Sequence, residues 1–211
     1  MAGFPESAPG RRVLGAATGV LIAGLVLGGC GGGGGTGASG TPEPEASAAT
    51  TAAANAAPLS ESPPTKITIA KIGVSAPVGK LGLRPDGRIE EPPLSKPNLT
   101  GWYKEGVTPG ETGPSVVLGH VDAKGRPAVF ARLKELKPGD RIQVARQDGS
   151  TATFAVERSQ RVDKNAFPHK KVFGEELDHS ALRLVTCGGA FDPASGHYKD
   201  NLIVYAKLAG A

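Results

Sequence analysis

Beyond about residue 65, the chain consists of short segments in which apolar and polar side chains alternate. Alternation with a period of two is typical of strands that bury one face. Turn-forming residues separate the segments, and residues 147–150 predict a two-residue hairpin turn between two of them. We therefore expect strands over residues 66–72, 115–118, 141–145, 151–156, 182–186 and 202–206.

One segment carries a helical pattern instead. Val129, Phe130, Leu133 and Leu136 recur at helical spacing, and Pro127 suits the first turn of a helix. This pattern predicts a helix over residues 127–136. Many short strands with one or two small helices, and no regular alternation of strands with helices, predict a mainly β fold. The expected architecture is a closed or nearly closed β-barrel.

The N-terminal residues 1–30 have the pattern of an export signal. Two arginines, Arg11 and Arg12, precede an apolar stretch over residues 13–27, which ends in Gly28-Gly29-Cys30. A cysteine directly after Leu-Gly-Gly resembles the lipobox of bacterial lipoproteins, in which that cysteine is lipidated and becomes the new N-terminus. The alternative is an uncleaved signal anchor. Either interpretation places the remainder outside the cytoplasmic membrane.

Residues 31–64 are rich in Gly, Ala, Pro and Thr and poor in large apolar side chains. Such a composition buries too little apolar surface to offset chain entropy, so we expect a disordered tether. Residues 65–211 have the length of a single domain with one core. The net charge of +4 and the pI of about 9.1 are modest, and no basic block indicates a nucleic-acid partner.

The chain has two cysteines, Cys30 in the signal segment and Cys187 in the domain. No partner for a disulfide within the domain exists, so Cys187 is a free thiol in an exported protein. It ends an alternating run and is followed by two glycines, which favours an accessible nucleophile. A histidine, His120, follows another short apolar run and is the candidate acid and base. The plainer interpretation is an inert, buried thiol.

Three motifs, in this order, resemble the sortase family of cysteine transpeptidases. Residues 66–78 are similar to its first strand and turn, residues 118–120 to its histidine segment, and residues 184–187 (Leu-Val-Thr-Cys) to its Leu-x-Thr-Cys box. The run over residues 186–205 most resembles the actinobacterial class F. The resemblance covers about residues 64–208 and implies a barrel of about eight strands.

The resemblance also implies a reaction. Cys187 would attack the Thr carbonyl of a Leu-Pro-x-Thr-Gly-type sorting signal and form a thioester, and His120 would shuttle the protons. Thr186 would shape the substrate site. The implied partners are secreted proteins with a C-terminal sorting signal and a cell-wall amine acceptor, at the outer face of the membrane. No cofactor or metal is expected.

One position departs from the family pattern. Where sortases carry an arginine at the start of the last strand, this chain has Lys199. Lysine supplies a point charge without the planar fork of donors that holds carbonyl oxygens, so the exchange is not conservative. Two alternatives therefore stay open beside transpeptidation: an enzyme that only hydrolyses the thioester, and a non-catalytic lipoprotein that binds wall peptides. Asp122 either orients His120 or belongs to a turn, and we favour the turn.

Overall fold

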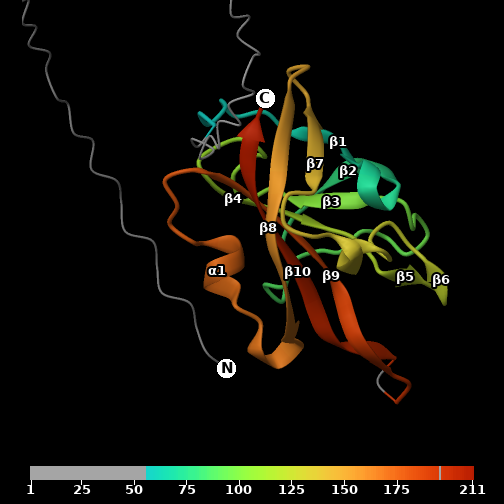
Figure 1. Cartoon of the computed structure of the whole chain (residues 1–211). Coiled ribbons are helices and arrows are strands. Elements are labelled where there is room, and N and C mark those ends of the chain that lie inside the picture. Colours follow the sequence, from blue (N-terminus) through green and yellow to red (C-terminus); the bar gives the residue numbers. More distant parts are fainter. Residues whose placement is uncertain (1–55, 195) are drawn as a thin grey trace, which may run out of the picture. The chain divides into compact units, whose positions relative to one another are not determined.

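The computed structural model describes residues 56–194 and 196–211 (Figure 1). Helices are short here: the 3-10 turns η1 (Ala70–Ile72), η2 (Leu133–Glu135) and η3 (Lys164–Ala166), and α1 (His169–Phe173). The strands of this part are β1 (Pro64–Ile69), β2 (Val74–Leu81), β3 (Thr100–Tyr103), β4 (Gly113–Leu118), β5 (Asp122–Ala123), β6 (Arg126–Pro127), β7 (Arg141–Arg146), β8 (Thr151–Asp163), β9 (Ser180–Asp192) and β10 (His197–Gly210).

Eight strands form a closed barrel in the order β1-β2-β3-β4-β9-β10-β8-β7, and β7 pairs with β1 to complete it. The pairs β2–β3 and β4–β9 are parallel, whereas the other pairs are antiparallel. β5 and β6 form a separate small hairpin. This architecture confirms the predicted barrel of about eight strands.

The alternation of side chains divides the barrel into an inner and an outer face. Leu182 and Leu184 of β9 lie in the inner cluster, which is the main core. Val185 of β9 and Ile203 of β10 lie in a second cluster on the other face, where Val172 of α1 packs against them. In Figure 1, α1 lies at the side of the long strands β8, β9 and β10.

Each predicted strand is present, although the first ends at Ile69, where η1 follows over Ala70–Ile72, and β8 is much longer than expected. It continues to Asp163, and its pairing with β10 shifts by one residue around Glu157, which is a β-bulge. The hairpin after β7 is also correct in place, but three residues rather than two lie between Arg146 and Ser150. Gly149 has a φ of 87° there, which is typical of a type I turn with a bulge.

The predicted helix over residues 127–136 is wrong. The segment begins in β6 and contains only the single 3-10 turn η2. Its apolar residues are nevertheless buried as the pattern required, with Phe130 at 1% and Leu133 at 0% exposure. Helical spacing also arises when successive turns face a core, so the pattern identified the buried face and not the backbone conformation.

The end of the predicted tether, from residue 56, contacts the domain. Residues 56–63 lie against the barrel, where Leu59 packs on the core and Ser62 is buried. The buried Arg146 donates a hydrogen bond to the Ser60 carbonyl. Backbone groups pair whatever their side chains are, so a segment with one large apolar residue still docks. The signal segment, Cys30 and the tether up to residue 55 lie outside the described residues. Within those described, no helix is long and apolar enough to cross a membrane.

Candidate active site

The sheet register places Cys187 and His120 at the same level of neighbouring strands. β4 and β9 run parallel with Leu118 opposite Val185, and the Gly119 amide continues the ladder by donating to the Val185 carbonyl over 3.1 Å. His120 and Cys187 lie two residues beyond Leu118 and Val185, respectively. The register therefore puts the two predicted catalytic residues at the same level of adjacent segments. No hydrogen bond joins thiol and imidazole among the described residues.

The backbone around His120 fixes its ring. His120 Nε2 lies 2.6 Å from the Pro92 carbonyl oxygen. A carbonyl only accepts, so Nε2 carries a proton, and in the neutral ring Nδ1 is the nitrogen left to accept one. Gly119 precedes the histidine because a Cβ there would lie 2.5 Å from the Phe130 ring.

The environment of Cys187 keeps its thiol protonated. Burial raises the pKa of the half-buried thiol, and the charges of Glu91 and Asp122 raise it further. Lys164 opposes them, both through its charge and as a donor. Lys164 and Cys187 form no hydrogen bond of regular length and angle, so the contact is a loose one. The resting site therefore holds a thiol with a cation beside it.

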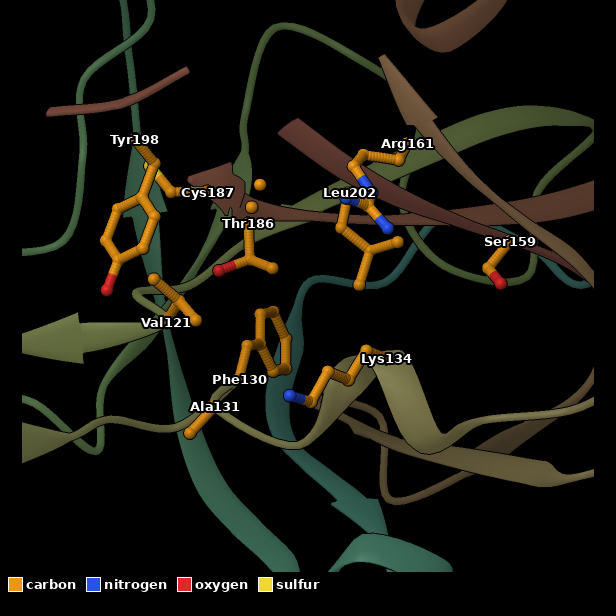
Figure 2. Close-up of a pocket in the computed structure, with 12 residues that line it drawn as sticks. Val121, Phe130, Ala131, Lys134, Ser159, Arg161, Thr186, Cys187, Tyr198 and Leu202 are labelled. Carbon is orange, nitrogen blue, oxygen red and sulfur yellow. The ribbon is translucent and has the colours of Figure 1, made fainter. Parts of the chain in front are cut away.

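Tyr198 is a further polar group at this site. Burial is the largest cause that raises its pKa. Asp122 raises it further, through its charge and as a hydrogen-bond acceptor, and the charge of Cys187 adds to the shift. Asp122 also accepts a hydrogen bond from the Gly125 amide over 3.1 Å, which confirms the expected turn. Figure 2 shows Tyr198 beside Cys187 at one end of a cleft.

Lys199, the predicted substitute for the family arginine, is exposed on β10. It is not among the groups that shift the pKa of Cys187, whereas Lys164 is. The register explains how Lys164 reaches the site. Cys187 pairs with Asn201, and Asn201 pairs with Val162 on β8, so Lys164 follows two residues beyond a position level with the thiol. Sequence reasoning ended β8 too early and missed this lysine.

A cleft of about 590 Å³ opens beside the thiol at the end of β9 (Figure 2). Thr186, the residue predicted to shape the site, forms part of its wall and is 4% exposed. Lys134 and Arg161 bring positive charge to the cleft. Its lining consists of Val121, Phe130, Ala131, Lys134, Ser159, Arg161, Thr186, Cys187, Gly188, Gly189, Tyr198 and Leu202. Across the described ranges, no group of three or more His, Cys, Asp or Glu residues is placed to bind a metal.

The model of the sortase domain matches residues 67–209, which is more than half of the chain and all of its barrel except its first and last residues. The chain belongs to the sortase family. It is thus a sortase-type cysteine transpeptidase. A comparison with curated protein sequences gives no significant match.

Solved structures of several sortase classes share the fold. The Sortase D5 transpeptidase of Clostridium perfringens aligns with a TM-score of 0.51 and 24% identity, over 69% of this chain and 78% of that chain. Sortase C-1 from Actinomyces oris has a TM-score of 0.53 and 21% identity, over 68% and 72%. A lid mutant of Sortase A from Corynebacterium diphtheriae has a TM-score of 0.53 and 20% identity, over 71% and 72%.

Proposed function

We propose that this sortase cleaves a Leu-Pro-x-Thr-Gly-type sorting signal and transfers the acyl group to a cell-wall amine. The observation that carries the proposal is the register of β4 and β9, which brings His120 level with a half-buried, unpaired Cys187. Leu118, two residues before His120, is partly exposed, and an apolar side chain at this place suits the Leu or Pro of the signal.

The first half-reaction begins from the protonated thiol. His120 Nδ1 accepts the Sγ proton, and the sulfur forms a bond to the Thr carbonyl carbon of the signal. As the tetrahedral intermediate collapses, the bond between Thr carbon and Gly nitrogen breaks, and His120 returns the proton to the departing amine. The cation beside Cys187 favours the thiolate and the developing oxyanion. Lys164 acts on the thiol through its charge, and Lys199 remains the position that matches the family arginine.

The second half-reaction reverses these roles. An incoming amine attacks the thioester carbon, His120 removes its proton, and the carbon–sulfur bond breaks to restore the thiol. Water in place of the amine would give hydrolysis instead. The Pro92 carbonyl holds the ring in one orientation throughout, which keeps the same nitrogen directed to both steps.

We also propose that the enzyme is of class F and works at the outer face of the membrane. The class rests on the run over residues 186–205, and the location on the signal segment with its lipobox-like Cys30. A lipid on Cys30, or an uncleaved anchor, would hold the domain through its tether. Processing that stops in the presence of globomycin supports lipidation, and unaffected processing favours the anchor.

The function is tested by incubating the full-length protein with a library of Leu-Pro-x-Thr-Gly-type peptides, with and without an amine. Mass spectrometry should find an acyl adduct on Cys187 and, with the amine, a transpeptidation product. Hydrolysed peptide alone would indicate the hydrolysis-only enzyme. If neither an adduct nor a cleaved peptide is found, the non-catalytic, peptide-binding lipoprotein is the remaining interpretation. Cys187→Ala must abolish adduct and product, since activity in that variant would exclude the mechanism.

A further inference from the structure

The β-bulge in β8 determines which of its residues reach the cleft. Before the bulge, Phe154 and Val156 belong to the inner cluster. After it, Arg161 pairs with Leu202 of β10 and lines the cleft, whereas Val162 belongs to the outer cluster. One extra residue has therefore turned Arg161 toward the cleft, which is a common use of bulges near active sites. Figure 2 shows its guanidinium beside Leu202 in the cleft wall.

The lining of the cleft includes two cations, Lys134 and Arg161, and no Asp or Glu. Carboxylates lie close by, since Asp122 acts on Tyr198 and Cys187, and the Asp200 side chain lies beside Gly189. In the described part of the chain neither cation is in an ion pair. Glu135, the neighbour of Lys134, is held by Arg132 at 2.7 Å. Cations that converge on a cleft without acidic partners are suited to a ligand that brings its own negative charge.

A buried hydroxyl in the same wall also lacks a partner. Thr186 is 4% exposed, and its Oγ1 has no hydrogen-bond partner among the residues that the structure describes. Leaving a buried hydroxyl unpaired is costly, so such groups commonly mark the place of a missing ligand or water. Thr186 directly precedes the nucleophile, which puts this unpaired group beside the reacting atoms.

We propose that this cleft binds the carboxylate of the acceptor, so that the preferred acceptor is an amine carrying a nearby carboxylate, such as an amino acid or a peptide end. Arg161 holds the carboxylate with two parallel donors and Lys134 adds charge. The inference rests on the proposed function, since it names the second substrate of that reaction.

The fixed residues of the donor signal, Leu, Pro, Thr and Gly, carry no side-chain charge and give these cations no counterpart. We place the donor on the opposite face of β9, to which the alternation of the strand assigns Cys187. Thr186 faces the other way, toward the cleft. An acceptor held there approaches the thioester from the side that the donor leaves free.

The test is a competition on the full-length enzyme. The peptide that acylates Cys187 best is offered with equal amounts of glycylglycine and glycylglycinamide, and the two products are compared by mass spectrometry. We expect glycylglycine to be preferred by wild type, and this preference to fall about fivefold in Arg161→Gln and in Lys134→Gln. Arg141→Gln, an exposed arginine of β7 away from the cleft, is the matched control.

Equal use of the two acceptors, or a preference unaltered in both cleft variants, would overturn the inference while acylation still supports the function. A second arm compares donor peptides with Glu or Gln at the variable position. If Arg161→Gln affects only that comparison, the cleft holds the donor and the inference is wrong. If no peptide acylates Cys187, calorimetry of glycylglycine binding decides: weaker binding in Arg161→Gln supports the cleft, and no binding refutes it.

Discussion

At the residue scale, Cys187 and His120 are the candidate reacting groups, and Lys164, Tyr198 and Pro92 lie around them. Cys187 and His120 were identifiable because an unpaired thiol in an exported chain and a histidine after an apolar run both stand at strand ends. Lys164, Tyr198 and Pro92 carry no such signal. They reach the site through pairing between distant strands and through a backbone carbonyl, which composition and periodicity do not encode.

The raised pKa of Cys187 predicts a thiol that reacts slowly at neutral pH. The rate of alkylation by iodoacetamide should rise with pH up to a midpoint above the ordinary thiol range, since only the thiolate attacks. Lys164 lowers the pKa, so Lys164→Gln should move the midpoint higher. Glu91 raises the pKa, so Glu91→Gln should move it lower. A midpoint unmoved by both changes would contradict the electrostatic account of Cys187.

The two lysines near the site predict different kinetics. Lys164→Gln should lower kcat/KM by about tenfold or more, because it removes the cation that acts on the Cys187 thiol and would favour the developing oxyanion. Lys164→Arg should retain most activity, since it keeps the charge. Lys199→Gln should have a smaller effect, given its exposed position. Steady-state cleavage of a sorting-signal peptide measures all three. The reverse order would assign the family arginine's role to Lys199.

At the scale of elements, strand positions could be predicted and their irregularities could not. Alternation with a period of two correctly located the strands that it predicted in the described barrel, because one face of each of these strands is buried. The β8 bulge at Glu157 reverses the alternation, so extrapolation from Phe154 would have turned Arg161 outward. The segment over residues 127–136 failed for a related reason, since buried turns imitate helical spacing.

The glycines after Cys187 predict a contrast between neighbours. Gly189 has a φ of 74°, and a Cβ there would collide with the Asp200 side chain. Gly188 has room for a Cβ, whose nearest neighbour would be Leu202 at 3.5 Å. Gly189→Ala should therefore lower the free energy of unfolding by about 1–2 kcal/mol, and Gly188→Ala should leave it nearly unchanged. Urea denaturation measures both. An equal change in the free energy of unfolding for both variants would contradict the assignment of strain to position 189.

At the scale of the whole molecule, the barrel brings together residues that lie far apart in sequence. Closure between β7 and β1 fixes the order of the strands, and the parallel pairing of β4 with β9 places His120 beside Cys187 across 67 positions of chain (187 − 120 = 67). Such a pairing follows from the fold and not from either segment. The family resemblance implied this pairing in advance, whereas the pattern of apolar residues alone predicted a closed or nearly closed β-barrel without the order of its strands.

The docked segment before β1 predicts where the stable domain begins. A protein of residues 65–211 should be less stable than one of residues 56–211, because Leu59 leaves the core and the buried Arg146 loses its bond to the Ser60 carbonyl. Losing the packing of Leu59 and the hydrogen bond of Arg146 should lower the free energy of unfolding by about 3 kcal/mol. Tm should fall by about 10 °C in thermal unfolding. Leu59→Ala in the longer protein separates the two causes, since it removes apolar packing and keeps the Arg146 bond. Identical melting of the two lengths would mean that residues 56–64 rest on the barrel without stabilising it.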